Sequence, residues 1–191
     1  NMHYMDGHVD SGKTIAFQSD RDGAARIYLQ DVATGAVRQL ATGPGFSMFP
    51  AWSPDSRMVV YSHGYLPKTA FQTVADAQPG WTGSHLNKID KSLKESLNGI
   101  NIWTVPVVGG TPKQLTGGMH CEYTPEVTPD GKDVVFTSPF GAKGGLLAHA
   151  NTMHVQRVPL AGGERQPLYA HSGAYAVQPT LSPDGKHLAF G

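Results

Sequence analysis

The stretches WSPDSRMVVYS (52–62), VTPDGKDVVFTS (127–138) and LSPDGKHLAFG (181–191) decide the fold. In each, a Ser/Thr-Pro-Asp turn leads into an apolar run. An aromatic residue follows the aspartate at a fixed distance of six residues: Asp55 to Tyr61, Asp130 to Phe136 and Asp184 to Phe190. Proline presets φ for a turn, aspartate bonds its own backbone, and glycine accepts positive φ. The motif therefore predicts a tight reversal between two strands and not a catalytic site.

The motif recurs at a spacing that indicates a repeat architecture. A degenerate copy, VDSGKTIAFQS (9–19), places Ser11 at the aspartate position and Phe17 at the aromatic position. The four turns are then 44, 75 and 54 residues apart. Two insertions account for the excess length, which leaves a period of about 40 residues. Such a period with four strands per unit is typical of β-propeller blades.

Each unit reads as four strands in the order A to D. Strand A precedes the turn at 47–53, 121–128 and 175–182, and strand B follows it at 13–19, 58–62, 133–138 and 187–190. Strand C is expected at 26–32, 100–107 and 152–160, and strand D at 36–42, 111–117 and 164–170. Strand C carries apolar residues on both faces, with Ile27 and Leu29 on one and Tyr28 on the other. This pattern indicates sheets that are covered on both sides.

The sequence therefore predicts an all-β fold, a β-propeller of three full four-stranded blades plus half a blade within 1–191. We place the blades at 1–42, 47–117, 121–170 and 175–191, the last incomplete. A closed propeller typically has four to eight blades, and open edges invite aggregation. We therefore expect this to be part of a larger propeller. The alternative is an open or strand-exchanged arrangement whose edges pair with another chain.

The amino-acid composition argues against some classes of binding partner. The chain has 15 basic and 15 acidic residues and no basic run, which argues against nucleic acid and anionic membranes. No apolar run is long enough to span a bilayer directly. Cys121 is the single cysteine, so no internal disulfide forms, and we expect it to be a small buried residue. The first residues have no basic or apolar region of a signal peptide.

Strand order assigns the irregular segments to one rim. A–B and C–D turns emerge on one side of a blade, and B–C and D–A connections on the other. The insertions 64–99 and 139–151 are B–C connections, and 85–97 has the apolar spacing of a helix. Insertions of this length are often functional. We expect partner contacts from the insertion 64–99 through four residues: Tyr65, Phe71, Trp81 and His85.

The candidate histidines map to the same rim, which carries the irregular connections. Imidazole and carboxylate groups there suit zinc, manganese or iron, and the candidate ligands are His120, Glu122, His149 and His171. The competing interpretation is that histidine is common in polar connections. No HxH or HExxH spacing supports a metal site, and we commit to none. GxSxG, Walker and GxGxxG motifs are also absent, so we assign no catalytic residue and expect no cofactor.

Three stretches resemble the repeats of TolB-like (WD40-like) β-propellers: PAWSPDSRMVVYS (50–62), IAFQSDRDGAARIYLQDVATGAVRQLAT (15–42) and TPEVTPDGKDVVFTSP (124–139). SDRDG (19–23) is similar to that family's B–C turn, and GGTPKQLT (109–116) to its C–D turn and D strand. The resemblance covers nearly the whole chain apart from the insertions. It implies the propeller fold and a periplasmic or secreted location, but one propeller fold serves many functions.

Three functions stay open at this point. The first is a non-catalytic scaffold that binds a protein partner through the insertion-bearing rim. The second is the propeller portion of a larger hydrolase of prolyl-oligopeptidase or amidohydrolase type, with the rest of the same polypeptide as partner. The third is a metal-dependent propeller lyase that resembles oligogalacturonate lyases. The first leads because catalytic motifs are absent.

Overall fold

A computed structural model describes residues 13–41, 43, 45–64, 99–118, 121–138, 153–170 and 176–191. Within these ranges the chain is all β, and none of its residues is helical. The strands are β1 (Thr14–Ser19), β2 (Arg26–Asp31), β3 (Val37–Gln39), β4 (Phe46–Trp52), β5 (Met58–Gly64), β6 (Ile100–Pro106), β7 (Lys113–Gln114), β8 (Tyr123–Val127), β9 (Asp133–Ser138), β10 (His154–Pro159), β11 (Gln166–Tyr169), β12 (Thr180–Leu181) and β13 (Leu188–Ala189).

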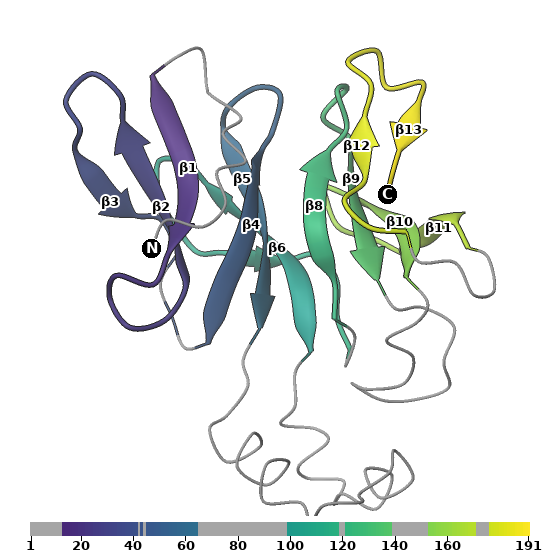
Figure 1. Cartoon of the computed structure of the whole chain (residues 1–191), viewed down its shortest axis with the longest axis horizontal. Helices are drawn as coiled ribbons and strands as arrows, with labels where there is room; N and C mark the ends of the chain where they lie inside the picture. The colour runs from purple at the N-terminus through teal and green to yellow at the C-terminus, as the bar shows by residue number, and fades with distance from the viewer. Residues whose placement is uncertain are drawn as a thin grey trace, which may run out of the picture.

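These strands form four antiparallel sheets in chain order (Figure 1). Sheet I contains β1–β3, sheet II β4–β7, sheet III β8–β11 and sheet IV β12–β13, and neighbours in sequence are neighbours in each sheet. The described strands coincide with the predicted ones, although β4 begins one residue earlier and β5 ends two residues later than predicted. The all-β propeller prediction is therefore confirmed. The boundaries that we assigned to the blades stay predictions. Residues 1–12, most of the insertions 64–99 and 139–151, and the expected helix 85–97 lie outside the described residues.

The core lies between the sheets. One cluster joins sheets I and II and includes Ile27, Leu29, Trp52 and Tyr61. A second joins sheets II and III through Val60, Ile102, Val134, Phe136 and others. A third joins sheets III and IV, where Val135, Val155 and Ala176 pack against Leu181 and Leu188. Sheets II and III are therefore apolar on both faces, as the pattern in strand C predicted.

Side chains along strand B point alternately to the two faces of the sheet, so each contacts either the preceding or the following sheet. In β5, Val59 and Tyr61 face sheet I, whereas Val60 faces sheet III. In β9, Val134 and Phe136 face sheet II, whereas Val135 faces sheet IV. We call the side toward the preceding sheet the leading face and the opposite side the trailing face. Tyr61 of β5 and Phe136 of β9 therefore both lie on the leading face of their sheets.

The Ser/Thr-Pro-Asp turns close on their own side chains. Asp55 Oδ1 accepts from Ser53 Oγ at 2.6 Å and from the Arg57 N–H at 3.1 Å. The Ser53 hydroxyl also accepts from the Met58 N–H at 2.9 Å. The turns at Asp130 and Asp184 repeat this network with matching distances. These bonds hold the pKa of all three aspartates below the ordinary value.

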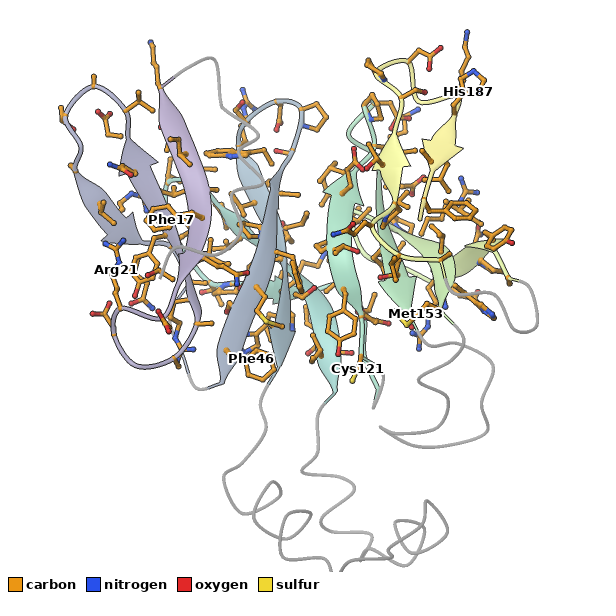
Figure 2. All side chains as sticks on the ribbon, viewed as in Figure 1. Phe17, Arg21, Phe46, Cys121, Met153 and His187 are labelled. Carbon is orange, nitrogen blue, oxygen red and sulfur yellow. The ribbon has the colours of Figure 1, made fainter. Side chains whose placement is uncertain are left out.

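The strand ends define two rims of the molecule. His187 lies near the upper edge of Figure 2, where the β12–β13 turn lies, as expected for the rim of tight turns. Phe46, Cys121 and Met153 lie at the lower edge, near the starts of β4, β8 and β10. We call these edges the upper rim and the lower rim. Cys121 is only partly buried, contrary to expectation, because it precedes β8 at this edge. Among the described residues, no helix could cross a membrane.

Prediction 1 concerns the residue after the turn aspartate, which is serine in one turn and glycine in the other two. Gly131 and Gly185 have φ of 72° and 71°, and Ser56 has φ of 58° at the same position. A side chain is strained at positive φ, whereas glycine is not. We expect Ser56→Gly to raise the free energy of unfolding by about 0.5–1 kcal/mol and Gly131→Ser to lower it by about 1 kcal/mol. Urea denaturation measures both; equal signs would contradict the account.

Candidate functional site

A backbone irregularity recurs in or just before the first strand of sheets II, III and IV. Phe49, Thr124 and Gln178 have φ of 54°, 49° and 51°, in the left-handed region that non-glycine residues rarely adopt. Each lies six residues before the aspartate of its turn. In β4 and β8 the pairing register shifts at this point, which marks a β-bulge. Three sheets therefore use the same strained conformation at the same height.

Proline explains the position of each bulge. Pro50, Pro125 and Pro179 follow the three strained residues and are buried. Proline cannot donate to a sheet ladder, so it is accommodated where the pairing is interrupted. The side chains before these prolines differ, as phenylalanine, threonine and glutamine, and all are at least partly exposed. The backbone conformation is thus the same in all three sheets, whereas the side chain at this position differs.

The bulges also form contacts between successive sheets. The Phe49 N–H donates to Gln18 Oε1 of sheet I at 3.0 Å. The Phe49 ring meets Tyr123 of sheet III edge to face, with ring centroids 6.2 Å apart. Farther along, the Leu181 N–H donates to Glu126 Oε2 at 3.1 Å. Backbone strain of this kind concentrates at functional positions, so we treat the bulges as part of the candidate site.

Sequence reasoning missed these bulges, although the signal was present. A proline occurs five residues before the turn aspartate in all three predicted A strands. Proline inside a strand indicates an edge or a bulge. The left-handed conformation of the preceding residue was not predictable, because proline normally favours extended backbone before it.

Glu122, a candidate metal ligand, lies buried between sheets II and III. Its Oε1 accepts from Arg165 Nη1 at 2.6 Å, and its Oε2 accepts from the Thr116 hydroxyl. The Glu122 N–H donates to the Ile100 carbonyl at 2.9 Å. Burial raises the pKa of Glu122 to about 7, and the bonds from Thr116 and Arg165 offset part of the effect. Both oxygens already bond to protein groups, so this carboxylate ties two sheets together.

His63 has a comparable structural role near the lower rim. Its Nδ1 is 2.9 Å from Ser47 Oγ, and its ring contacts Trp103 edge to face with a centroid distance of 5.3 Å. Burial, followed by the nearby positive charge of Arg26, lowers the pKa of His63. The neutral imidazole therefore completes the packing between β4, β5 and β6.

The other sequence-predicted site residues lie outside the described ranges. These are the candidate ligands His120, His149 and His171 and the candidate contact residues Tyr65, Phe71, Trp81 and His85. Over the described residues, no three His, Cys, Asp or Glu side chains are grouped so that they could hold a metal ion. The roles assigned to these residues stay predictions.

Prediction 2 concerns the pH dependence of the buried carboxyl. Its pKa is about 7 in the folded chain against an ordinary 4.5, so between these values the folded state binds the proton more tightly. The free energy of unfolding should therefore fall as pH rises through this window, by at most about 3 kcal/mol. Glu122→Gln should remove this slope in urea denaturation, and Glu164→Gln, at an exposed position, should keep it. An unchanged slope in Glu122→Gln would contradict the prediction.

The chain is similar in sequence to curated proteins, although no family model matches it. The Tol-Pal system protein TolB of Francisella tularensis is 25% identical over 200 residues, covering 95% of this chain and 43% of that protein. The uncharacterized peptidase YuxL of Bacillus subtilis is 28% identical over 136 residues, covering 66% of this chain and 20% of that protein.

A solved structure supports the same assignment. TolB from Acinetobacter baumannii matches with a TM-score of 0.62 and 22% identity, covering 94% of this chain and 35% of that chain, which shows a shared fold. This chain spans about half the length, or less, of the curated relatives that it matches. Repeat sequence, sheet order and both comparisons agree that this chain is a β-propeller similar to that of TolB proteins.

Proposed function

We propose that this chain is a non-catalytic protein-binding propeller module that contacts its partner through the lower rim. The observation that carries the proposal is the similarity to TolB of the Tol-Pal system, which extends over 95% of this chain. A protein of that system is therefore the partner class that we propose. The same resemblance supports a periplasmic or secreted location, which we include in the proposal.

The chemistry of the two rims supports the choice of rim. On the upper rim, the turn aspartates bond within their own turns, so their acceptors are already engaged. On the lower half, Phe49 and Tyr123 are partly exposed aromatic residues from adjacent sheets. Aromatic residues are enriched among the residues that dominate protein interfaces. The β-bulges present Phe49 and Tyr123 on a backbone whose conformation is restricted by the prolines that follow.

The insertion 64–99 completes the proposed surface. Gly64 ends β5 and Ile100 begins β6, so both ends of the insertion join strand ends of sheet II. We propose Tyr65, Phe71, Trp81 and His85 as contact residues, on the sequence argument given above. Tryptophan and tyrosine supply large contact areas with a polar group, which suits them to this role.

A second candidate function is the propeller portion of a larger hydrolase. It is favoured by the 28% identity with the peptidase YuxL, of which this chain covers 20%. In that case the partner of the lower rim would be a catalytic domain of the same polypeptide. The complete gene separates the two functions, because a hydrolase must encode a nucleophile motif such as GxSxG outside these residues.

Prediction 3 tests the proposed rim with purified proteins. Each Tol-Pal system protein from the organism that carries this chain is immobilised, and binding is measured by biolayer interferometry. Trp81→Ala and Phe71→Ala should weaken binding about tenfold each, since truncated interface aromatics cost more than 1 kcal/mol. Val108→Ser is the matched control, because Val108 is 92% exposed in the β6–β7 turn and should leave affinity unchanged.

Two results would contradict the proposal. If the wild-type chain binds none of these proteins, the proposed partner class is wrong. If Val108→Ser weakens binding while Trp81→Ala and Phe71→Ala do not, the partner contacts the upper rim instead.

A further inference from the structure

Four buried polar side chains between sheets II and III each have an atom that no described residue bonds. On the trailing face of sheet II these atoms are Ser62 Oγ and Thr104 Oγ1, and on the leading face of sheet III they are Ser138 Oγ and Gln156 Nε2. None of the four residues is more than 3% exposed. A buried polar atom without a partner destabilises the folded state, so four of them in one junction require a physical explanation.

Strand pairing sets the spacing of these groups on each face. Ser62 lies opposite Ile102, which packs in the core between the two sheets, and Thr104 is two residues farther along β6. Ser138 and Gln156 are related in the same way in sheet III. Such diagonal neighbours are roughly 7–8 Å apart, which is too far for the short side chains of serine and threonine to bond each other. A bridging molecule that bonds to both groups spans this separation.

Comparison with the preceding junction indicates room for such a molecule. Sheet II packs Trp52 and Trp103 toward sheet I, whereas the same repeat positions of sheet III carry Val127 and Gln156 toward sheet II. Glu122 is larger than its counterpart in sheet II and fills part of the space that the smaller residues leave. Both of its carboxylate oxygens already accept bonds from other protein groups, so it does not satisfy the four polar atoms.

The junction between sheets I and II differs in how its polar groups are paired. Two atoms there, Trp52 Nε1 and Asn101 Oδ1, also have no partner among the described residues, but both come from sheet II. On the side of sheet I, Gln18 accepts directly from the Phe49 N–H at 3.0 Å. Ser62 takes the place of Gln18 in sheet II and has a shorter side chain. Within the described ranges, only sheets II and III both contribute such atoms to the junction that they share.

We propose that ordered water occupies the junction between sheets II and III and is bound by Ser62, Thr104, Ser138 and Gln156. Hydroxyl groups donate and accept, and an amide nitrogen donates, so a molecule that does both satisfies all four groups. Buried water typically makes about three hydrogen bonds to groups that have no other partner. Ser62 and Ser138 place the site toward the ends of β5 and β9, near the lower rim. The site is internal to the sheets and does not depend on the function proposed above.

Prediction 4 is tested first by locating the water. A crystal structure of the full chain should show water within about 3.2 Å of each of the four polar atoms. In solution, magnetic relaxation dispersion of oxygen-17 water detects water molecules that stay inside the protein. The amplitude of this dispersion should fall when Ser62→Ala is combined with Thr104→Val, because both ligands from sheet II are then removed. Val108→Ser, at a position that is 92% exposed, is the control and should leave the amplitude unchanged.

Urea denaturation then distinguishes bound water from unsatisfied groups. Thr104→Val keeps the side-chain shape and removes the hydroxyl, so with water bound it should raise the unfolding constant about fivefold. Thr104→Val and Ser62→Ala should be non-additive because they share water, whereas Thr104→Val and Leu29→Ala, in different junctions, should add.

Three results would each overturn the proposal. The first is a crystal structure without water at any of the four atoms. The second is a Thr104→Val variant that is more stable than wild type, as expected if the hydroxyl has no partner at all. The third is additivity of Thr104→Val and Ser62→Ala as complete as that of the control pair with Leu29→Ala.

Discussion

Every sheet of this chain must bury two apolar faces, and the rest of the structure depends on that constraint. A four-stranded sheet with Val, Ile, Tyr and Trp on both sides is stable only between neighbours. The chain meets the requirement by placing successive sheets face to face, so that three clusters form between four sheets. The hydrophobic core of this chain is therefore a series of junctions and has no single centre.

The junctions are asymmetric, and this asymmetry gives the series a direction. Large residues such as Tyr61 and Phe136 occupy leading faces, whereas Val60 and Val135 occupy trailing faces. Large residues against smaller branched ones fill the space between sheets without voids. Polar bonds then fix neighbouring sheets, as between Thr116 and Glu122 or between Gln18 and the Phe49 backbone.

Burial of both faces leaves the strand ends as the places where function can vary. Upper turns are short and bond within themselves, whereas the lower rim receives the long connections. The bulges at Phe49 and Thr124, and the same backbone conformation at Gln178 just before β12, extend this variability to the strands. Because buried prolines fix the backbone there, the preceding side chain can change without altering the sheet. A propeller can in this way keep its fold while its binding surface diverges.

The sequence predicted the strands and turns, and it missed the contacts and backbone conformations that no local pattern encodes. Strands, turns and the two-sided pattern repeat with the motif, so Ile27 and Leu29 could be assigned to one face of strand C before any coordinates, and both lie in the core with sheet II. Glu122 was chosen as a candidate ligand because it lay near histidines, but its partner Arg165 is 43 residues away and no local pattern links the two. The left-handed bulges contradict the usual preference before proline, so only the fold reveals them. Cysteine favours burial, but Cys121 precedes β8 at the lower rim and is only partly buried.

Hydrogen exchange, resolved to individual peptides by mass spectrometry at low chain concentration, tests the central claim most directly. If burial of both faces stabilises each sheet, peptides from β5–β6 and β9–β10 should exchange slowest, and those from β12–β13 and β3 fastest. The same order should persist as urea is added, since among the described residues sheets I and IV each take part in one junction and sheets II and III in two. Equal protection across all four sheets, or slower exchange in β12–β13 than in β9–β10, would contradict the account.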